Sequence, residues 1–453
     1  MNTKAKDHYW LKSGFLNILQ NFSGVFFGTA SFVLLVRVLP SKEEYGIWTL
    51  FMTTTVILEL IRNGLVQSAL VRFISSSPAE EHENIITASL SISGVLTILC
   101  IAANLLLAPM VATMWKAPIL VPMFYLYNII FLFTGFVTQA NCIEQANLKF
   151  NGVFATNFAR QCIFFVFILI CFITKYPVTL VALVYVQILC AGVAALMAYF
   201  YVKPYLHYNF RFQKEWIKKL FHYGKFAFGT SISSQLSNTL DQWMLAALMS
   251  PVASGAFNIA VRITNLVDIP TSAIATIVFP QSAKRIETDG KESIKYLYEK
   301  SVGTTMALMI PGLLVLYIFT DLVIHLLAGA KYNDSIPLLK VTLLCCLLMP
   351  YGRLFGTILD SIGKTRLTFT MVVCTATMNL TLNYFFIKRW GAMGAAYATL
   401  LSNSVGFTVA QIILRRFLRV NIWNTFIYAY QFYPEFYQKY VKKYIRPSKP
   451  LAS

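Results

Sequence analysis

Long apolar runs constrain this chain more than any other feature of its sequence. A helix needs about 20 mostly apolar residues to cross the hydrocarbon of a bilayer. With 57% hydrophobic and only 13% charged residues, the 453-residue chain cannot hide its apolar surface in ordinary soluble domains. We therefore expect an all-α polytopic membrane protein with twelve transmembrane helices in two six-helix lobes. The predicted spans are 13–39, 46–72, 86–114, 118–141, 152–174, 178–202, 223–249, 253–282, 301–328, 335–361, 367–387 and 392–415.

The basic stretch from Lys203 to Lys219 fixes the predicted orientation. It separates the sixth span from the seventh and carries five Lys and Arg residues against the single acid Glu215. Lys and Arg are enriched on the cytoplasmic side of membrane proteins, so we predict that this stretch is cytoplasmic. An even number of spans then places both termini in the cytoplasm. The turns that fall on the same side are 73–85, 142–151, 283–300 and 362–366, and they hold most of the remaining basic turn residues.

The two halves look like repeats. An offset of 209 residues pairs Gly46 with Gly255 and Glu59 with Asp268, so a carboxylate falls at matching depth in the second helix of each half. We interpret the halves as parallel repeats of the kind found in transporters that rock two lobes about a central site. The predicted parts are the N-lobe 1–202, the cytoplasmic connector 203–222, the C-lobe 223–416 and an interfacial aromatic and basic tail 417–453.

Composition and motifs narrow the function. The net charge of +19 falls mostly between apolar segments, where anionic head groups explain it, so we expect no nucleic-acid partner. The eight cysteines form no CxxC pair, and the five histidines build no metal-site pattern. The outward turns are too short for a catalytic domain. We expect no enzyme activity, no metal and no cofactor.

Ionisable and polar groups inside spans are costly and usually face a bundle interior or a water-filled cavity. In the seventh span, Ser231, Ser234, Asn238 and Asp241 follow a spacing that puts them on one helix face, with Gln242 beside them. This stripe is predicted to line the space between the lobes. The alternative is that it packs on a neighbouring helix through hydrogen bonds.

The second and eighth spans each carry both signs of charge. Glu59 and Arg62 are three residues apart in the second span. In the eighth span Arg262 lies six residues before Asp268, and Pro270, which should bend the helix, follows Asp268 closely. One interpretation makes these residues structural ion pairs. The other makes the arginines phosphate ligands and the acids gates or cation-coupling sites.

Further polar residues extend the candidate set. Arg160 and Arg353 lie inside the fifth and tenth spans, and Lys225 lies at the inner mouth of the seventh, where it can equally snorkel to the interface. The first span has no acid but carries Asn17 and Asn21 near a run of small residues, which also suits close helix packing.

Two motifs resemble a known family. The segments LVRVLPSKEEYGIWTL and SNTLDQWMLAALMSPVASGAFNIA, together with the basic connector after six spans, are similar to the polysaccharide flippases (Wzx-type) of the multidrug/oligosaccharidyl-lipid/polysaccharide exporter superfamily. The chain keeps the Asp of the seventh helix at Asp241 but has Gln242 where that family often has a basic residue.

This resemblance implies a flippase of the bacterial inner membrane. Its substrate would be a polyprenyl-pyrophosphate-linked oligosaccharide, moved to the outer leaflet by alternating access for O-antigen, other lipopolysaccharide or capsule biosynthesis. The predicted head-group ligands are Arg62, Arg262, Arg160, Arg353, Lys225, Asn238, Ser234, Asn17 and Asn21, and the predicted coupling or gating residues are Asp241, Glu59 and Asp268.

The driving force and the partners stay open. An H+ gradient, a Na+ gradient or the membrane potential would each serve, and the polysaccharide polymerase and chain-length machinery are candidate partners besides the lipid bilayer. The alternative function is a multidrug/cation antiporter of the same superfamily, because fold alone does not fix function.

Overall fold

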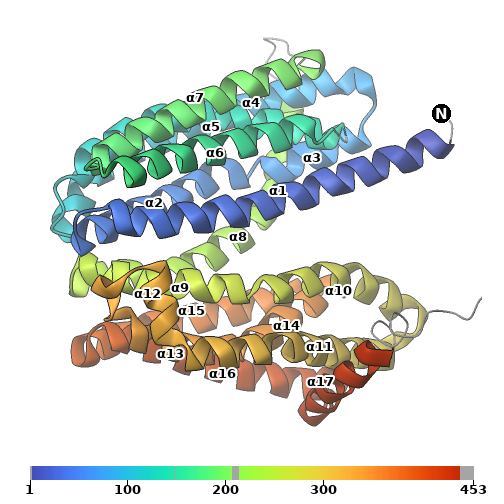
Figure 1. Ribbon diagram of the computed structural model, residues 1–453. Coiled ribbons are helices and arrows are strands. Elements are labelled where there is room, and N and C mark those ends of the chain that lie inside the picture. Colours follow the sequence, from blue (N-terminus) through green and yellow to red (C-terminus); the bar gives the residue numbers. More distant parts are fainter. Residues whose placement is uncertain (1–2, 148, 207–213, 439–453) are drawn as a thin grey trace, which may run out of the picture. The chain divides into compact units, whose positions relative to one another are not determined.

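The computed structural model describes residues 3–147, 149–206 and 214–438, and within these ranges the chain is helical without a β-strand. The helices gather into two compact units, Met1–Gly255 and Ala256–Ser453. The ribbon in Figure 1 follows the order of the helices along the chain.

The first unit is a bundle of long helices. Pairs that pack along their lengths include α5 with α7, α1 with α6, and α4 with α5, while α8 lies against α2, α3 and α4. The elements are α1 (Thr3–Val38), α2 (Lys42–Gly64), α3 (Gln67–Ser76), α4 (Ala79–Met114), α5 (Leu120–Ala146), α6 (Asn151–Thr174), α7 (Leu180–Val202), η1 (Lys203–Tyr205), α8 (Lys214–Leu248) and the start of α9 (Pro251–Val267).

The second unit is a separate bundle. Its closest pairs are α15 with α16, α11 with α17, and α10 with both α11 and α14. Besides the rest of α9 it contains α10 (Ile269–Thr288), α11 (Gly290–Ile318), α12 (Thr320–Leu327), η2 (Ala330–Tyr332), α13 (Ser335–Cys346), α14 (Met349–Ser361), α15 (Thr365–Trp390), α16 (Ala392–Leu418) and α17 (Ile422–Phe436).

The predicted all-α membrane class is confirmed. Each predicted span coincides with one helix or with two consecutive helices, and eight helices of the described chain are long and apolar enough to cross a membrane. Two bent pairs raise this number to ten if each pair forms one span. Helices α1 and α8, which carry the polar stripes, are not among them. The total of twelve spans and the cytoplasmic termini stay predictions.

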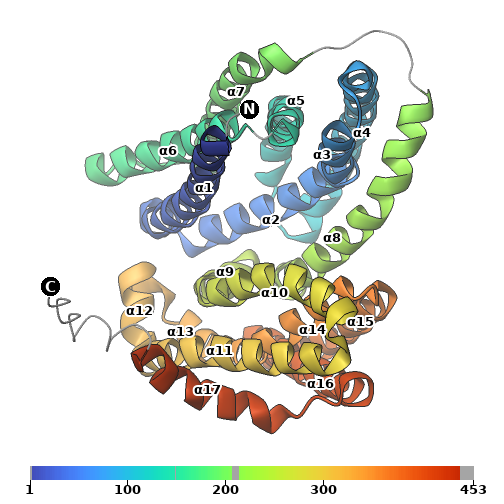
Figure 2. The ribbon, with the colours of Figure 1, turned by 90° about the vertical axis from the view of Figure 1, so that its right-hand side faces the viewer.

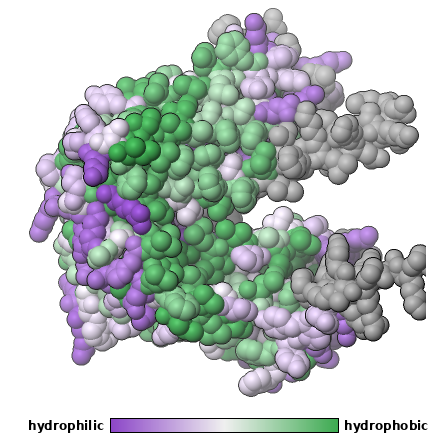
Figure 3. All heavy atoms as spheres, viewed as in Figure 1, coloured by the Kyte–Doolittle hydropathy of each residue, from purple (hydrophilic) through white to green (hydrophobic). Residues whose placement is uncertain are grey.

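Apolar side chains face outward along the middle of the helices. Ile98 on α4 is 68% exposed and Leu189 on α7 is 58% exposed, which is the pattern expected where lipid replaces water. In Figure 3 green residues cover the middle of the helices in each unit, while purple residues gather at the helix ends.

Both bent pairs have a proline beside the break. Helices α9 and α10 meet at 46° around Asp268, with Pro270 at the start of α10, and α13 and α14 meet at 41°, with Pro350 at the start of α14. Proline has no N–H to donate and its ring crowds the preceding turn, so it stops one helix and starts the next. The predicted bend near Pro270 is confirmed.

The division into lobes at residues 202 and 223 stays a prediction. Helix α8 packs on α2, α3 and α4 in the first unit, and the boundary between the units falls after Gly255. In α8, Gly224 approaches the backbone of Leu65 so closely that a Cβ atom would overlap it. The absence of a side chain at this glycine therefore lets α8 lie directly on the junction of α2 and α3.

The C-terminal helix α17 is held along α11 (Figure 2). Glu299 accepts hydrogen bonds from the Asn421 backbone N–H (2.7 Å) and from Asn424 Nδ2 (2.8 Å), which satisfies donors at the start of α17. The aromatic face of α17 stays outward, with Tyr430 79% exposed. This arrangement suits the predicted interfacial tail, of which residues 439–453 lie outside the described residues.

The two glycines paired by the 209-residue offset lie against each other. A Cβ atom on Gly255 would stand 2.9 Å from the Gly46 Cα, and one on Gly46 would overlap the Pro251 carbonyl. The start of α2 therefore touches the start of α9 backbone to backbone. A side chain at either glycine would separate these two helix starts.

We expect Gly46→Ala to destabilise the protein, because the new methyl group must displace a backbone, and overpacking of this kind costs about 1–3 kcal/mol. Gly94→Ala on α4 is the matched control, since nothing lies within 4 Å of its Cβ position. At this open helical position alanine gains about 0.5–1 kcal/mol over glycine. Thermal unfolding in detergent measures both. An unfolding temperature for Gly46→Ala equal to or above that of the unaltered protein would contradict the close contact.

Candidate functional site

Two polar clusters lie inside the helices, one in each unit. The first is centred on Arg62 of α2, whose side chain is fully buried. Its Nε donates to Asn63 Oδ1 (3.1 Å), one Nη donates to the backbone carbonyl of Phe131, and the other donates to Thr134 Oγ1 (3.1 Å). The guanidinium also lies 5.5 Å from the centre of the Phe131 ring. These contacts tie α2 to α5.

Glu59 belongs to the same cluster. The Thr134 hydroxyl, which accepts from Arg62, lies 3.1 Å from Glu59 Oε1 and links the two charged residues. The phenol of Tyr127 donates to the same carboxylate oxygen at 3.0 Å. Charges inside membrane-spanning helices usually pair with one another or with polar groups of neighbouring helices, as these two do through Thr134. Of the two interpretations of this pair, the arrangement favours the structural one.

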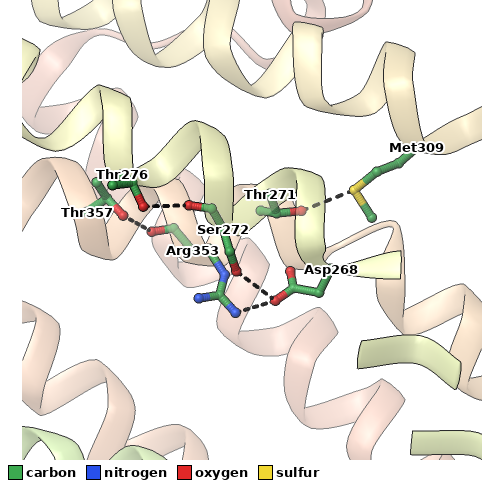
Figure 4. Close-up of polar contacts among 7 residues, drawn as sticks. All are labelled: Asp268, Thr271, Ser272, Thr276, Met309, Arg353 and Thr357. Atoms are coloured by element: carbon green, nitrogen blue, oxygen red, sulfur yellow. Dashed lines mark hydrogen bonds and ion pairs between the residues drawn. The ribbon is translucent and has the colours of Figure 1, made fainter. Parts of the chain in front are cut away.

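The second cluster is centred on Asp268, at the break between α9 and α10 (Figure 4). Its Oδ2 forms an ion pair with the Arg353 guanidinium from α14 and accepts from the Ser272 hydroxyl at 3.4 Å. Pro350 begins α14 only three residues before Arg353. The ion pair therefore connects the two bent helix pairs of this unit. Asp268 lies at the bend between α9 and α10, and Arg353 lies within one helical turn of Pro350 at the bend between α13 and α14.

Exposure differs between the partners of this ion pair. The Asp268 side chain is 13% exposed, whereas the Arg353 side chain is 46% exposed. The second carboxylate oxygen, Asp268 Oδ1, is buried and has no hydrogen-bond partner among the described residues. A buried carboxylate oxygen without a hydrogen-bond donor is costly, and a small cation can satisfy it. The guanidinium, in turn, has an open side from which an anionic group can approach.

The two clusters join the same predicted spans of each half. In each half, the carboxylate that the 209-residue offset pairs lies on the second predicted span and is bound to a residue of the fourth predicted span. Glu59 reaches Tyr127 and Thr134 of α5, and Asp268 reaches Arg353 of α14. In the first unit the cation is on the same helix as the acid and is buried. In the second unit it is on the partner helix and is half exposed.

The remaining predicted ligands lie mostly on exposed surface. Arg262 is exposed on α9, and its Nε donates to Asn258 Oδ1 at 3.2 Å. Arg160 on α6 and Lys225 on α8 are exposed, as are Ser234 and Asn238 on α8.

The polar stripe of α8 changes its exposure along the helix. Asp241 and Gln242 are buried in the first unit, whereas Ser231, Ser234 and Asn238 are exposed. The side chains of Asn17 and Asn21 lie outside the described residues. The assignment of these residues to a substrate cavity stays a prediction.

Sequence reasoning missed the partners that complete both clusters. Tyr127 and Thr134 lie seven residues apart on α5, a spacing that puts them on one helix face, and this was the available signal. Ser272 is four residues after Asp268 and could be found the same way. The pairing of Asp268 with Arg353 joins residues 85 positions apart and has no signal in one sequence.

A family model described as "Polysaccharide biosynthesis protein" matches residues 34–337, more than half of the chain. The chain belongs to this family. The match includes both motif segments and the Glu59, Arg62 and Asp268 positions, and ends before Arg353.

Curated relatives of this family member are distant. It is 21% identical to the lipopolysaccharide biosynthesis protein WzxC of Escherichia coli (strain K12) over 85% of this chain and 75% of that protein. It is 24% identical to the probable low-salt glycan biosynthesis flippase Agl15 of Haloferax volcanii, over 45% of this chain. That alignment spans 43% of Agl15, less than half of its length.

Solved structures give the fold of this family member. The lipid II flippase MurJ in an inward closed conformation superimposes with a TM-score of 0.71 at 16% identity, covering 96% of this chain and 93% of that one. An inward-facing multidrug resistance MATE transporter of the MOP superfamily gives 0.73 at 15% identity, covering 87% and 95%. The protein therefore has the MOP exporter fold and is a multi-pass membrane protein.

We expect Arg62→Ala to destabilise the protein strongly. The change leaves Glu59, Thr134 and the Phe131 carbonyl without their buried partner, and breaking such a pair from one side costs about 3–5 kcal/mol. Arg160→Ala removes the same charge from an exposed position on α6 and should cost less than about 0.5 kcal/mol. Thermal unfolding of the two purified variants tests this. Equal unfolding temperatures would show that the buried network does not hold α2 on α5.

We also expect Asp268 and Arg353 to be energetically coupled. Arg353→Gln leaves a buried carboxylate without its cation, whereas the same change in an Asp268→Asn background leaves only neutral groups. A double-mutant cycle of unfolding free energies should give a coupling toward the low end of about 0.5–3 kcal/mol, because Arg353 is partly solvated. Additive effects of the two changes would contradict the ion pair.

Proposed function

We propose that the protein is a flippase that moves a polyprenyl-pyrophosphate-linked oligosaccharide from the cytoplasmic to the outer leaflet by alternating access. The family match carries this proposal, because it covers most of the chain and describes polysaccharide biosynthesis. The MOP exporter fold supports transport. WzxC and Agl15, whose names refer to lipopolysaccharide and glycan biosynthesis, support the substrate class.

The chemistry of the substrate suits the exposed cations. A sugar chain and a pyrophosphate cannot cross hydrocarbon alone, because their polar groups lose water without gaining partners. Arginine donates two parallel hydrogen bonds to a phosphate. Arg353 and Arg262 are exposed arginines of the second unit that lie well inside predicted spans, and we assign head-group binding first to them. Arg62 is assigned the positioning of α2 against α5.

The Asp268 carboxylate supplies a means of coupling. It holds Arg353, and a small cation at its second oxygen, which is buried and has no hydrogen-bond partner among the described residues, would weaken that ion pair. Arg353 would then be available to the pyrophosphate. Cation binding and substrate binding would thereby favour each other, which is the linkage that a coupled transporter needs. The bends on both sides of the ion pair are the places where the helices can move.

Location and partners follow from the same proposal. We infer that the protein works in the bacterial inner membrane, loading substrate on the cytoplasmic side and delivering it to the machinery that polymerises the glycan and sets its chain length. The protein would carry the substrate without breaking a covalent bond, and no enzyme activity is assigned to it.

We expect Arg262→Ala with Arg353→Ala to lower flipping at least about tenfold, since each lost charge-assisted hydrogen bond to an anion is worth roughly 1.5–3 kcal/mol. The double variant is reconstituted in proteoliposomes with the lipid-linked oligosaccharide that accumulates on the inner leaflet of a deletion strain. Lys175→Ala with Lys388→Ala removes two exposed cations, one just after α6 and one in the last turn of α15, and should leave transport unchanged.

Two results would contradict this proposal. One is unchanged flipping by the double variant when it is folded and inserted at the level of the control. The other is a drug-resistance phenotype in a pump-deficient host together with normal glycan export in the deletion strain. The second result would favour the multidrug antiporter, which shares the MOP exporter fold.

A further inference from the structure

A basic pocket lies between α3 and the first turns of α8, in the first unit. Its volume is about 840 Å³, and its walls are Arg72, Phe73, Glu215, Lys218, Lys219, His222 and Tyr223. None of these residues belongs to the two polar clusters or to the proposed head-group ligands. The pocket therefore needs an explanation of its own.

The charges that line the pocket have mostly one sign. Arg72, Lys218 and Lys219 are cations, and Glu215 is the single carboxylate among the lining residues. Arg72 lies one turn before the end of α3, and the two lysines lie in the second turn of α8. This is the end of the bundle that the basic connector places in the cytoplasm. At that depth a cationic pocket stands beside the anionic head groups of the inner leaflet.

The wall behind these charges is aromatic. The Phe73 ring lies 5.6 Å from that of Trp216 and 5.9 Å from that of Tyr223, both in edge-to-face geometry. Behind them Leu220 of α8 and Ala69 of α3 are fully buried, and they pack with Ala88 of α4 in one hydrophobic cluster. The two helices that line the pocket are thus anchored in a hydrophobic cluster shared with α4. An apolar chain has a surface to lie on beneath the charges.

Two of the cations are positioned by this wall. The Arg72 guanidinium carbon lies 4.4 Å from the centre of the Tyr223 ring, and Lys219 Nζ lies 4.3 Å from the centre of the Trp216 ring. A guanidinium stacked on a ring keeps its N–H edge directed outward, where it can donate two hydrogen bonds to one phosphate. The side-chain entropy that a ligand would otherwise have to remove is already reduced.

We propose that this pocket binds an anionic glycerophospholipid of the cytoplasmic leaflet. The phosphate lies between Arg72, Lys218 and Lys219, and the start of an acyl chain lies along Phe73 and Tyr223. Interfacial aromatic residues next to a basic pocket at the cytoplasmic end of helices are the combination that recognises such a lipid. Because α3 and α8 each supply cations, the bound lipid joins these two helices. Its presence therefore stabilises the packing of α8 on the first unit.

The experiment measures phosphatidylglycerol binding by the full-length protein. Purified protein is titrated with phosphatidylglycerol in detergent, and the copies retained are counted by native mass spectrometry. The pocket variant is Arg72→Gln with Lys218→Gln and Lys219→Gln. The matched control is Lys284→Gln with Lys291→Gln and Arg366→Gln, which removes three exposed cations from predicted cytoplasmic turns or their borders in the second unit.

One surface charge near anionic lipid is worth about fivefold in binding. We expect the pocket variant to bind phosphatidylglycerol more than tenfold more weakly than the unaltered protein, and the control variant to keep the affinity of this site. Glu215→Gln gives the opposite prediction: it removes the one opposing charge and should tighten binding severalfold. Since Glu215 is exposed, this variant tests the site even if the triple variant does not fold.

The lipid source is tested separately with two other probes, polyprenyl pyrophosphate and inorganic phosphate. Phosphatidylglycerol affinity that does not change in the pocket variant and in Glu215→Gln would overturn the proposal. If the pocket variant loses affinity for polyprenyl pyrophosphate alone, the pocket is part of the transport route. If the unaltered protein binds inorganic phosphate as tightly as phosphatidylglycerol, the pocket is a site for soluble anions. Either result would also be evidence against a phospholipid site.

Discussion

Hydrocarbon offers no hydrogen-bond partner, so every charged side chain on a spanning helix must find one within the protein or reach water. The interior of both units follows from this constraint. Arg62 reaches acceptors on α5, and Asp268 reaches a cation on α14. These contacts fix α2 against α5 in the first unit, and they fix the break between α9 and α10 against α14 in the second. Groups that are costly to place in a membrane thereby determine which helices pack.

The two clusters are built alike but differ in how far their charged groups are buried and satisfied. The first is closed: its cation is fully buried, and hydroxyl and carbonyl groups from α5 complete its coordination. The second is open: its cation is half exposed, one carboxylate oxygen has no partner among the described residues, and both contributing helices are interrupted beside a proline. A closed network resists rearrangement, because opening it exposes several unsatisfied groups at once. An open pair next to two bends can exchange partners at lower cost. The first cluster is therefore suited to hold its helices together, and the second to change its partners.

The proposed substrate suits a similar division of the surface. A lipid-linked glycan combines an anionic pyrophosphate, polar sugars and a long apolar tail. Exposed arginines on predicted spans suit the first, and the apolar outer surface lets the tail stay in the bilayer. The basic pocket at the start of α8 and the aromatic face of α17 lie in regions whose residues suit the interface instead. The chemistry of the chain therefore changes with depth, from basic and aromatic helix ends to an apolar middle.

The sequence by itself determined the class of fold and the places of its helices. Apolar runs of membrane length admit only helices, because a helix satisfies its backbone hydrogen bonds within one segment. The bend at Pro270 was also readable, since it depends on the local chemistry of proline. The contact between Gly46 and Gly255 was not, because the 209-residue offset aligned these glycines as equivalent positions and not as neighbours. What only the tertiary structure decided is which charge meets which. Glu59 and Arg62 are joined through Thr134 of another helix, and Asp268 meets Arg353 from 85 residues away. Such pairings depend on the packing of distant helices, and spacing along one helix carries no information about them.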